Sequence, residues 1–184
     1  YCSSAKMKID SEAIAMLGEN IGADLAALVN ALDKLKILCP EGESISTALV
    51  SKNIGISKDF NEFELHKALG ERDDRKALMI ANYFANNQKN HHLIKVIVSL
   101  YYFYSKLIKY HSVPNPADSQ TLARTIGTSP YFLGQYKTAA RNHPLVSLER
   151  AIKVLYDTDL KSKGVGSTSK SNELMIEMVS KLLR

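Results

Sequence analysis

The sequence predicts an all-α fold, and three observations support this prediction. Apolar residues recur at steps of three and four along most of the chain, which is the spacing of one face of a helix. Glycine and proline, which punctuate turn-rich β folds, number only nine and five in 184 residues. Helix start and stop signals separate the periodic stretches, and no stretch has the period-two alternation of a strand.

Three short helices are expected in residues 1–55. The second covers about 23–38, where Leu25 begins an apolar face at three- and four-residue steps, and Pro40 ends it because proline lacks the amide that a helix needs. Ser46 is a suitable N-cap for the third helix. These helices predict one small bundle with Leu25 in its core.

Residues 56–184 are expected to form a second, larger helical domain. Its segment 91–111, HHLIKVIVSLYYFYSKLIKYH, is apolar nearly all round, as in a central helix against which other helices pack on several sides. The four aromatic residues 101–104 point to all sides of this helix, so most of them are expected in the core or at a contact with another subunit.

Positive charge is concentrated in the second part of the chain. Residues 1–55 hold five lysines against seven acidic residues, whereas 56–184 hold 19 basic residues against 12 acidic ones. Within the second part, 86–164 alone hold 11 basic and 4 acidic residues. This excess indicates either proximity to a polyanion such as nucleic acid or a solvated lysine surface on an ordinary helical protein.

No catalytic or metal-binding group of residues is evident. Cys2 and Cys39 have no partner at metal-ligand spacing and are interpreted as reduced thiols of a cytosolic protein. His91 and His92 are neighbours that point in different directions on a helix. The acidic pair in 70–75, GERDDR, alternates with arginines and is interpreted as a solvated helix start. The sequence therefore predicts neither a metal nor a cofactor.

The sequence also gives expectations about location and extent. The longest apolar run, within 93–108, is interrupted by lysines and is shorter than the roughly 20 apolar residues that span a bilayer. No signal peptide is recognisable. The chain starts abruptly and without methionine, so we expect a cytoplasmic segment of a longer protein.

Residues 121–141, TLARTIGTSPYFLGQYKTAAR, are similar to a helix-turn-helix and raise the alternative of a DNA-binding regulator. A recognition helix should present polar residues to the bases, whereas Tyr131 and the next two residues suit burial. The segment is better interpreted as a packed helical corner, on which Lys137 and Arg141 form a basic stripe that can meet phosphates.

The polar loop DLKSKGVGSTSKS, residues 159–171, is a second candidate for phosphate binding. Lys161, Lys163 and Lys170 flank glycines and small hydroxyl residues, a composition that suits phosphates without base specificity. The alternative is a flexible, solvated loop.

Four stretches, in this order, resemble the carboxy-terminal two-thirds of the delta subunit of the bacterial DNA polymerase III clamp loader. They are IGADLAALVNALDKL, FELHKALGERDDRKAL, LARTIGTSPYFLGQYKTAAR and AIKVLYDTDLKSKG. None of them is a catalytic signature, and the specificity lies in their order. The resemblance implies that residues 1–55 are the three-helix lid of a degenerate AAA+ module and that 56–184 are the collar domain, which joins the loader subunits in a ring.

The resemblance also implies that the lid has lost its role with ATP. In ATP-using relatives the second lid helix begins Gly-x-x-Arg, and that arginine reaches the nucleotide phosphates. Here Leu25 stands at the arginine position, and leucine can neither donate a hydrogen bond nor balance phosphate charge. The chain contains no phosphate-binding Gly-x-x-x-x-Gly-Lys-Ser/Thr loop. We expect a non-catalytic subunit that needs no cofactor.

The partners implied by the resemblance are the gamma/tau ATPase subunits, delta prime, primed DNA bound without sequence preference, and the sliding clamp. The clamp would be gripped by an amino-terminal domain outside this chain. An exposed apolar surface for subunit contact is expected on two helices. Its candidate residues are Tyr101, Tyr102, Tyr104, Met175 and Met178.

Overall fold

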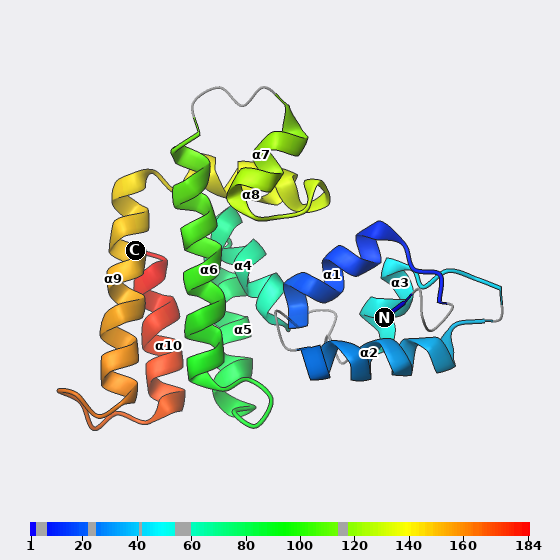
Figure 1. Ribbon diagram of the computed structural model, residues 1–184. Coiled ribbons are helices and arrows are strands. Elements are labelled where there is room, and N and C mark those ends of the chain that lie inside the picture. The colour runs from blue at the N-terminus through cyan, green and yellow to red at the C-terminus, as the bar shows by residue number, and fades with distance from the viewer. Residues whose placement is uncertain (3–6, 22–24, 41, 54–59, 114–117) are drawn as a thin grey trace. The chain divides into compact units, whose positions relative to one another are not determined.

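The chain is helical throughout the part that the computed structural model describes, which is residues 1–2, 7–21, 25–40, 42–53, 60–113 and 118–184 (Figure 1). Over these residues no strand forms, and the extended pairing consists of an isolated bridge between Ile9 and Ile45. The all-α prediction is therefore confirmed. The helices are α1 (Ser11–Ile21), α2 (Leu25–Leu38), α3 (Thr47–Asn53), α4 (Glu62–Glu71), α5 (Asp74–Asn86), α6 (Leu93–His111), α7 (Ser119–Ile126), the 3-10 turn η1 (Pro130–Phe132), α8 (Leu133–Asn142), α9 (Leu145–Ser162) and α10 (Ser171–Leu182).

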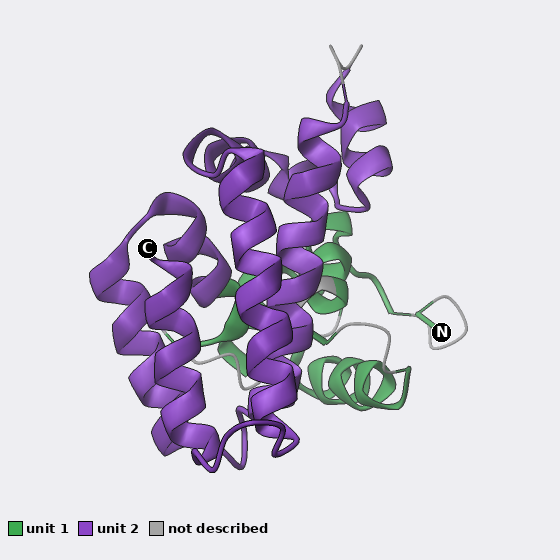
Figure 2. Cartoon of the chain, turned by 90° about the vertical axis from the view of Figure 1, so that its left-hand side faces the viewer, with its two compact units in different colours: residues 1–63 green, residues 64–184 purple. Residues whose placement is uncertain are grey.

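The chain divides into two compact units, Tyr1–Phe63 and Glu64–Arg184, which we call unit 1 and unit 2 (Figure 2). The division falls in the first turn of α4. The boundary expected after residue 55 lies among 54–59, which are outside the described residues. Gly22 to Asp24 of the degenerate lid motif are also outside the described residues.

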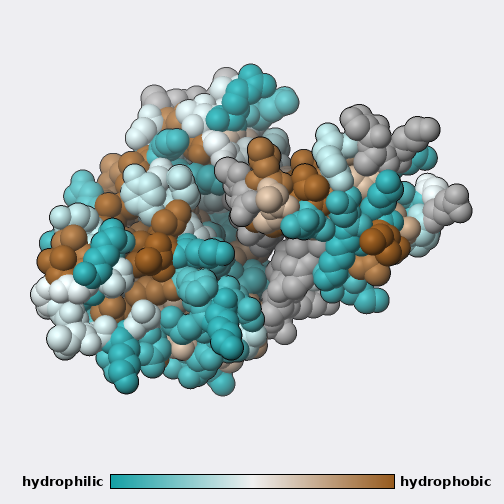
Figure 3. Space-filling view, turned by 60° about the horizontal axis from the view of Figure 1, so that its bottom comes forward, coloured by the Kyte–Doolittle hydropathy of each residue, from teal (hydrophilic) through white to brown (hydrophobic). Residues whose placement is uncertain are grey.

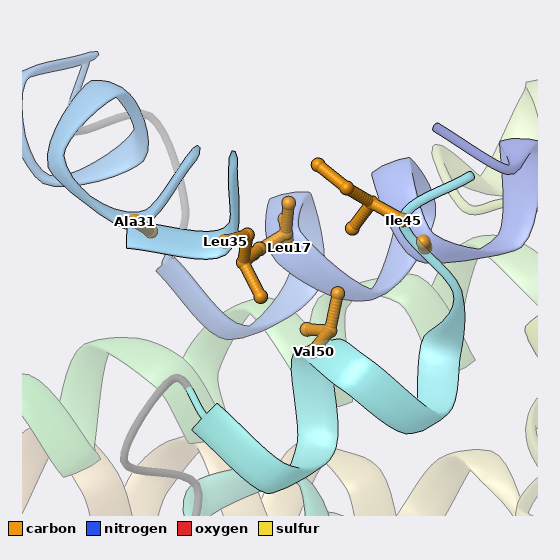
Figure 4. Close-up of a cluster of buried hydrophobic side chains, with 6 residues drawn as sticks. Leu17, Ala31, Leu35, Ile45 and Val50 are labelled. Carbon is orange, nitrogen blue, oxygen red and sulfur yellow. The ribbon is translucent and has the colours of Figure 1, made fainter. Parts of the chain in front are cut away.

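Unit 1 is built around one apolar cluster from its three helices and the extended segment before α3 (Figure 4). Leu17, Leu35 and Val50 are at most 2% exposed. Ser46 begins α3 as expected, because its Oγ accepts a hydrogen bond from the Leu49 amide at 3.4 Å. The cluster consists of Ala13, Leu17, Ala31, Leu35, Ile45 and Val50.

The prediction that Leu25 lies in this core is wrong. Its side chain is 76% exposed, although Leu28, one turn further on, packs against the cluster. Leu25 is the first residue of α2. The helical period places it on the same face as the residues that pack against the cluster, but none of the described helices covers it at this end of α2. Periodicity alone could not show where along α2 the packing begins.

Unit 2 is organised around α6, which packs against α7, α8, α9 and α10, while α10 also packs against α5 and α9. One side of α6 is buried, including Leu100, Phe103 and Leu107. The expectation that other helices pack on several sides of α6 is confirmed. Its packing is not complete, because Ile94 and Val98 on its other side are about half exposed.

Helices α4 and α8 approach each other closely at Gly70. A Cβ atom at Gly70 would lie 2.9 Å from the Cβ of Ala139, so glycine permits this contact. Two hydrogen bonds hold the same junction. The Asn142 side-chain amide donates to the Gly70 carbonyl at 2.9 Å, and His143 Nε2 lies 2.9 Å from the Leu69 carbonyl oxygen. The end of α8 is thereby fixed on the body of unit 2.

Candidate nucleic-acid and subunit interfaces

The first candidate surface is the loop between α9 and α10, where two of the three predicted lysines are already paired with carboxylates. Lys161 Nζ lies 2.7 Å from Glu177 Oε1, and Lys163 Nζ lies 2.6 Å from Asp159 Oδ2. The hydrogen bond to Glu177 raises the pKa of Lys161, and the same bond, with one from Lys181, lowers the pKa of Glu177. Lys163 and Asp159 offset each other, whereas Glu177 also pairs with Lys181 at 2.6 Å, so that group of three side chains keeps a net positive charge.

The rest of this loop combines two glycines in the left-handed conformation with an exposed lysine. Gly164 and Gly166 adopt positive φ values of 84° and 67°, which side-chain-bearing residues rarely adopt. Lys170 is exposed at the start of α10, and its backbone amide donates to Glu173 at 3.1 Å. Of the predicted phosphate ligands in the loop, Lys170 has no ion pair among the described residues.

The second candidate surface is the corner formed by α7, η1 and α8. Asp118 caps α7, and Gly127 ends it in the left-handed conformation with φ 77°. Phe132, Leu133 and Tyr136 are at most 9% exposed, so the first turn of α8 packs inward as predicted. Within the first turn of α8, Leu133 and Tyr136 are buried and Gly134 is exposed, so this turn presents few polar side chains to base edges, which disfavours the regulator alternative.

Tyr131 departs from this pattern, because it is 52% exposed although burial was expected for it. It lies in the 3-10 turn before α8, where Phe132 takes the inward position and the Tyr131 ring packs edge-on against Phe132 from the solvent side, with ring centroids 4.9 Å apart. The ring of Tyr136 is held against Phe103 at a centroid distance of 5.8 Å, with Lys106 Nζ 5.6 Å from the Tyr136 ring centroid.

Lys137 and Arg141 are exposed on the outer face of α8, at the four-residue spacing that places them on one side of the helix. Arg124, in the last turn of α7, is exposed as well. Sequence reasoning did not single out Arg124. The signal that could have found it is the scarcity of acidic residues around the corner.

The predicted subunit-contact residues fall into two groups. Tyr101 and Tyr102 are 49% and 61% exposed, as an interface requires. Tyr104, Met175 and Met178 are all 0% exposed, so their assignment to an exposed surface is wrong. The two methionines are buried because α5 and α9 both pack on α10.

Tyr104 points into the interior of unit 2. Its buried hydroxyl has no hydrogen-bond partner among the described residues, and burial raises the pKa of Tyr104. Its ring contacts the ring of His143 edge-on at 6.0 Å. A residue so enclosed contributes to the fold and is unavailable to another subunit.

Sequence reasoning missed Ile94 and Val98, which are 55% and 46% exposed. Together with Tyr101 and Tyr102 they form an apolar strip along α6, which we call the α6 strip. The four residues share one side of the helix at helical spacing, and a wheel drawn for α6 alone could have shown this. Figure 3 shows exposed hydrophobic side chains, in brown, among hydrophilic ones on one face of the molecule.

The other charged or metal-ligating candidates have structural roles. Asp73 caps α5 by accepting the Lys76 amide at 3.0 Å, which confirms the interpretation of GERDDR as a helix start. The ring of His91 stacks on Phe84 at 4.0 Å, and burial lowers the pKa of His91. Over the described part of the chain, no three His, Cys, Asp or Glu residues are grouped so that they could hold a metal ion. In the same part, none of the helices is both long and apolar enough to cross a membrane.

Comparison with known proteins gives a likeness to a solved structure. No protein-family model matches the chain, and no curated protein matches it. Among solved structures, the Bacillus subtilis DNA clamp loader delta protein (YqeN) matches 99% of this chain with a TM-score of 0.63 at 20% sequence identity. The match spans 53% of that chain, so this chain corresponds to about half of its length. The likeness shows that the described part of the chain has a helical fold of the clamp-loader delta type.

Proposed function

We propose that this chain is part of the delta subunit of a bacterial DNA polymerase III clamp loader. The observation that carries the proposal is the extent of the structural match, which includes 99% of the chain and therefore both compact units. In this proposal, residues 1–55 are the lid of a degenerate AAA+ module and 56–184 are the collar. The four stretches that resemble the family lie in both units.

The proposed role is assembly, without a reaction catalysed by this chain. The subunit would join the gamma/tau ATPases and delta prime in the cytoplasm, so that changes driven by ATP elsewhere in the ring act on the sliding clamp at primed DNA. Leu25 supports this role, because an exposed leucine at the position of the phosphate-contacting arginine offers ATP no charge. The clamp would be bound by a domain outside this chain.

The α6 strip is the surface that we assign to subunit contact. Ile94, Val98, Tyr101 and Tyr102 are each about half exposed or more, on a helix whose opposite side forms the core of unit 2. Aromatic residues are enriched at protein interfaces, where a rigid side chain buries a large area at a small entropic cost. The strip is therefore anchored on a rigid element, as an assembly surface requires.

Co-purification with the other loader subunits of the same organism tests the proposal. When the subunits are co-expressed, the chain should elute with them as one complex. Tyr102→Ser should reduce the amount of chain in the complex, whereas Tyr131→Ser, which removes another tyrosine that is more than half exposed from the α7–α8 corner, should not. If the ATPase subunits and delta prime assemble and the chain elutes alone, the proposal is wrong.

A further inference from the structure

The sequence around the α7–α8 corner is nearly free of acidic residues. Between Asp74 and Glu149, Asp118 is the sole acidic residue, while the same interval holds nine lysines and arginines. The carboxylate of Asp118 is occupied, because it accepts hydrogen bonds from the Thr121 amide at 2.7 Å and the Thr121 hydroxyl at 2.9 Å. These bonds lower the pKa of Asp118, to which the charge of Arg124 also contributes.

Three basic side chains project from this corner into solvent. Arg124 is in the last turn of α7, and Lys137 and Arg141 are one turn apart on α8. All three are exposed. Among the described residues, one ion pair joins α4 to α5, and the others lie within or between α9 and α10, including the residue after α9. None of these ion pairs includes Arg124, Lys137 or Arg141. Lys137 and Arg141 therefore offer unpaired positive charge to an external anion, and Arg124 adds a third charge, part of which is offset by Asp118.

The corner holds these side chains on a rigid support. Phe132 and Tyr136 are buried beneath it, and the end of α8 is tied to α4 by the bond from Asn142 to the Gly70 carbonyl. The helices that carry these side chains therefore need not rearrange when an anion binds, and the freedom lost is that of the side chains alone. The α9–α10 loop is different, since Lys161 and Lys163 would each have to leave a carboxylate before meeting a phosphate.

We propose that the outer face of the α7–α8 corner, formed by Arg124, Lys137 and Arg141, binds the phosphate backbone of duplex DNA without regard to base sequence. Positive charge with few neighbouring carboxylates attracts a polyanion, and lysine and arginine contacts to phosphates fix position without reading sequence. The first turn of α8 buries Leu133 and Tyr136 and carries no basic residue, so the basic face lies beyond the turn that a recognition helix presents to the bases. The inference deepens the proposed function by locating a DNA surface, but it requires no partner subunit.

Fluorescence anisotropy with the 184-residue chain and a labelled duplex of about 20 base pairs of arbitrary sequence tests this. The corner variant carries Arg124→Gln, Lys137→Gln and Arg141→Gln. A charge-matched control carries Lys67→Gln, Lys89→Gln and Lys95→Gln, three exposed lysines of unit 2 that lie outside the corner. Glutamine keeps a helix propensity close to that of the original residues, so both variants should fold.

The corner variant should lose duplex affinity, and the slope of log K against log salt should flatten by up to roughly one unit for each phosphate contact removed. The control should keep nearly all of the slope. A third variant in the loop, with Lys161, Lys163 and Lys170 changed to Gln, should flatten the slope less than the corner variant, because two of its lysines are paired.

Several outcomes would overturn the inference. They are an absence of duplex binding by the unaltered chain at low salt, equal losses in the corner and control variants, a loss confined to one base sequence, and binding to single strands but not to duplex. If the triple variant fails to fold, Lys137→Gln and Arg141→Gln are measured singly, and each should flatten the slope by up to about one unit. Because no other subunit is present, failure here leaves the co-purification test of assembly unaffected.

Discussion

Acidification from pH 7.5 to pH 5.0 is expected to destabilise unit 2 through His66. This side chain extends from α4 toward α6, where Nε2 lies 3.0 Å from the Ser99 hydroxyl and the ring stacks on Phe103 at 4.9 Å and 13°. Burial, reinforced by the positive charge of Lys106, lowers the pKa of His66 from 6.5 to about 3. The folded state therefore holds His66 neutral throughout this pH range.

The direction of the effect follows from the state that takes up the proton first. In the unfolded chain His66 has its ordinary pKa near 6.5. Below this pH His66 is therefore protonated in the unfolded state but stays neutral in the folded state. The stability that depends on neutral His66 is complete above pH 6.5 and is lost progressively as the pH falls toward 3. At pH 5.0 the loss from this group amounts to about 2 kcal/mol.

Hydrogen exchange of the α6 backbone amides, corrected for the intrinsic pH dependence of exchange, measures the opening of unit 2 separately from unit 1. A loss of about 2 kcal/mol corresponds to a roughly thirtyfold larger opening constant at pH 5.0 than at pH 7.5. His66→Gln should remove this part of the pH response. His91 and His143, whose pKa values are also lowered by burial, titrate in both proteins and cancel in the comparison. If the variant keeps the full response, the assignment to His66 is refuted.

Three further predictions concern ATP, self-association and the core of unit 1. Titration calorimetry with ATP and Mg²⁺ should show no saturable heat, and micromolar binding would contradict the degenerate lid. The isolated chain should self-associate with increasing concentration in sedimentation runs, and Tyr101→Ser with Tyr102→Ser should reduce this; a strictly monomeric unaltered chain would count against the α6 strip. Leu35→Ala should destabilise unit 1 by roughly 2–5 kcal/mol in hydrogen exchange of α1–α3, whereas Ile37→Ala, at a site 83% exposed, should change it little.

The positions of the helices could be predicted from the sequence because their signals are local. Ser46 caps α3 and Asp73 caps α5 through bonds to amides three residues away, so the sequence neighbourhood contains both partners. Burial could not be predicted with the same success, since it depends on which helix lies opposite. Leu25 and Met175 are both apolar residues at helical spacing, yet one is 76% exposed and the other 0%. What separates them is the packing of α5 and α9 on α10, which no local pattern contains.

The distribution of positive charge also depends on which side chains meet in the folded protein. Residues 86–164 hold an excess of basic residues, but the part of that excess at the end of α9 is matched in three dimensions. Lys163 pairs with Asp159 inside the interval, and Lys161 pairs with Glu177, which lies outside it. Glu177 also pairs with Lys181, so this cluster keeps its net charge, but each of these ammonium groups is held against a carboxylate rather than left open to solvent. Around α7 and α8 hardly any acid is available to pair in this way, and the charge predicted from the sequence therefore remains exposed on the folded surface.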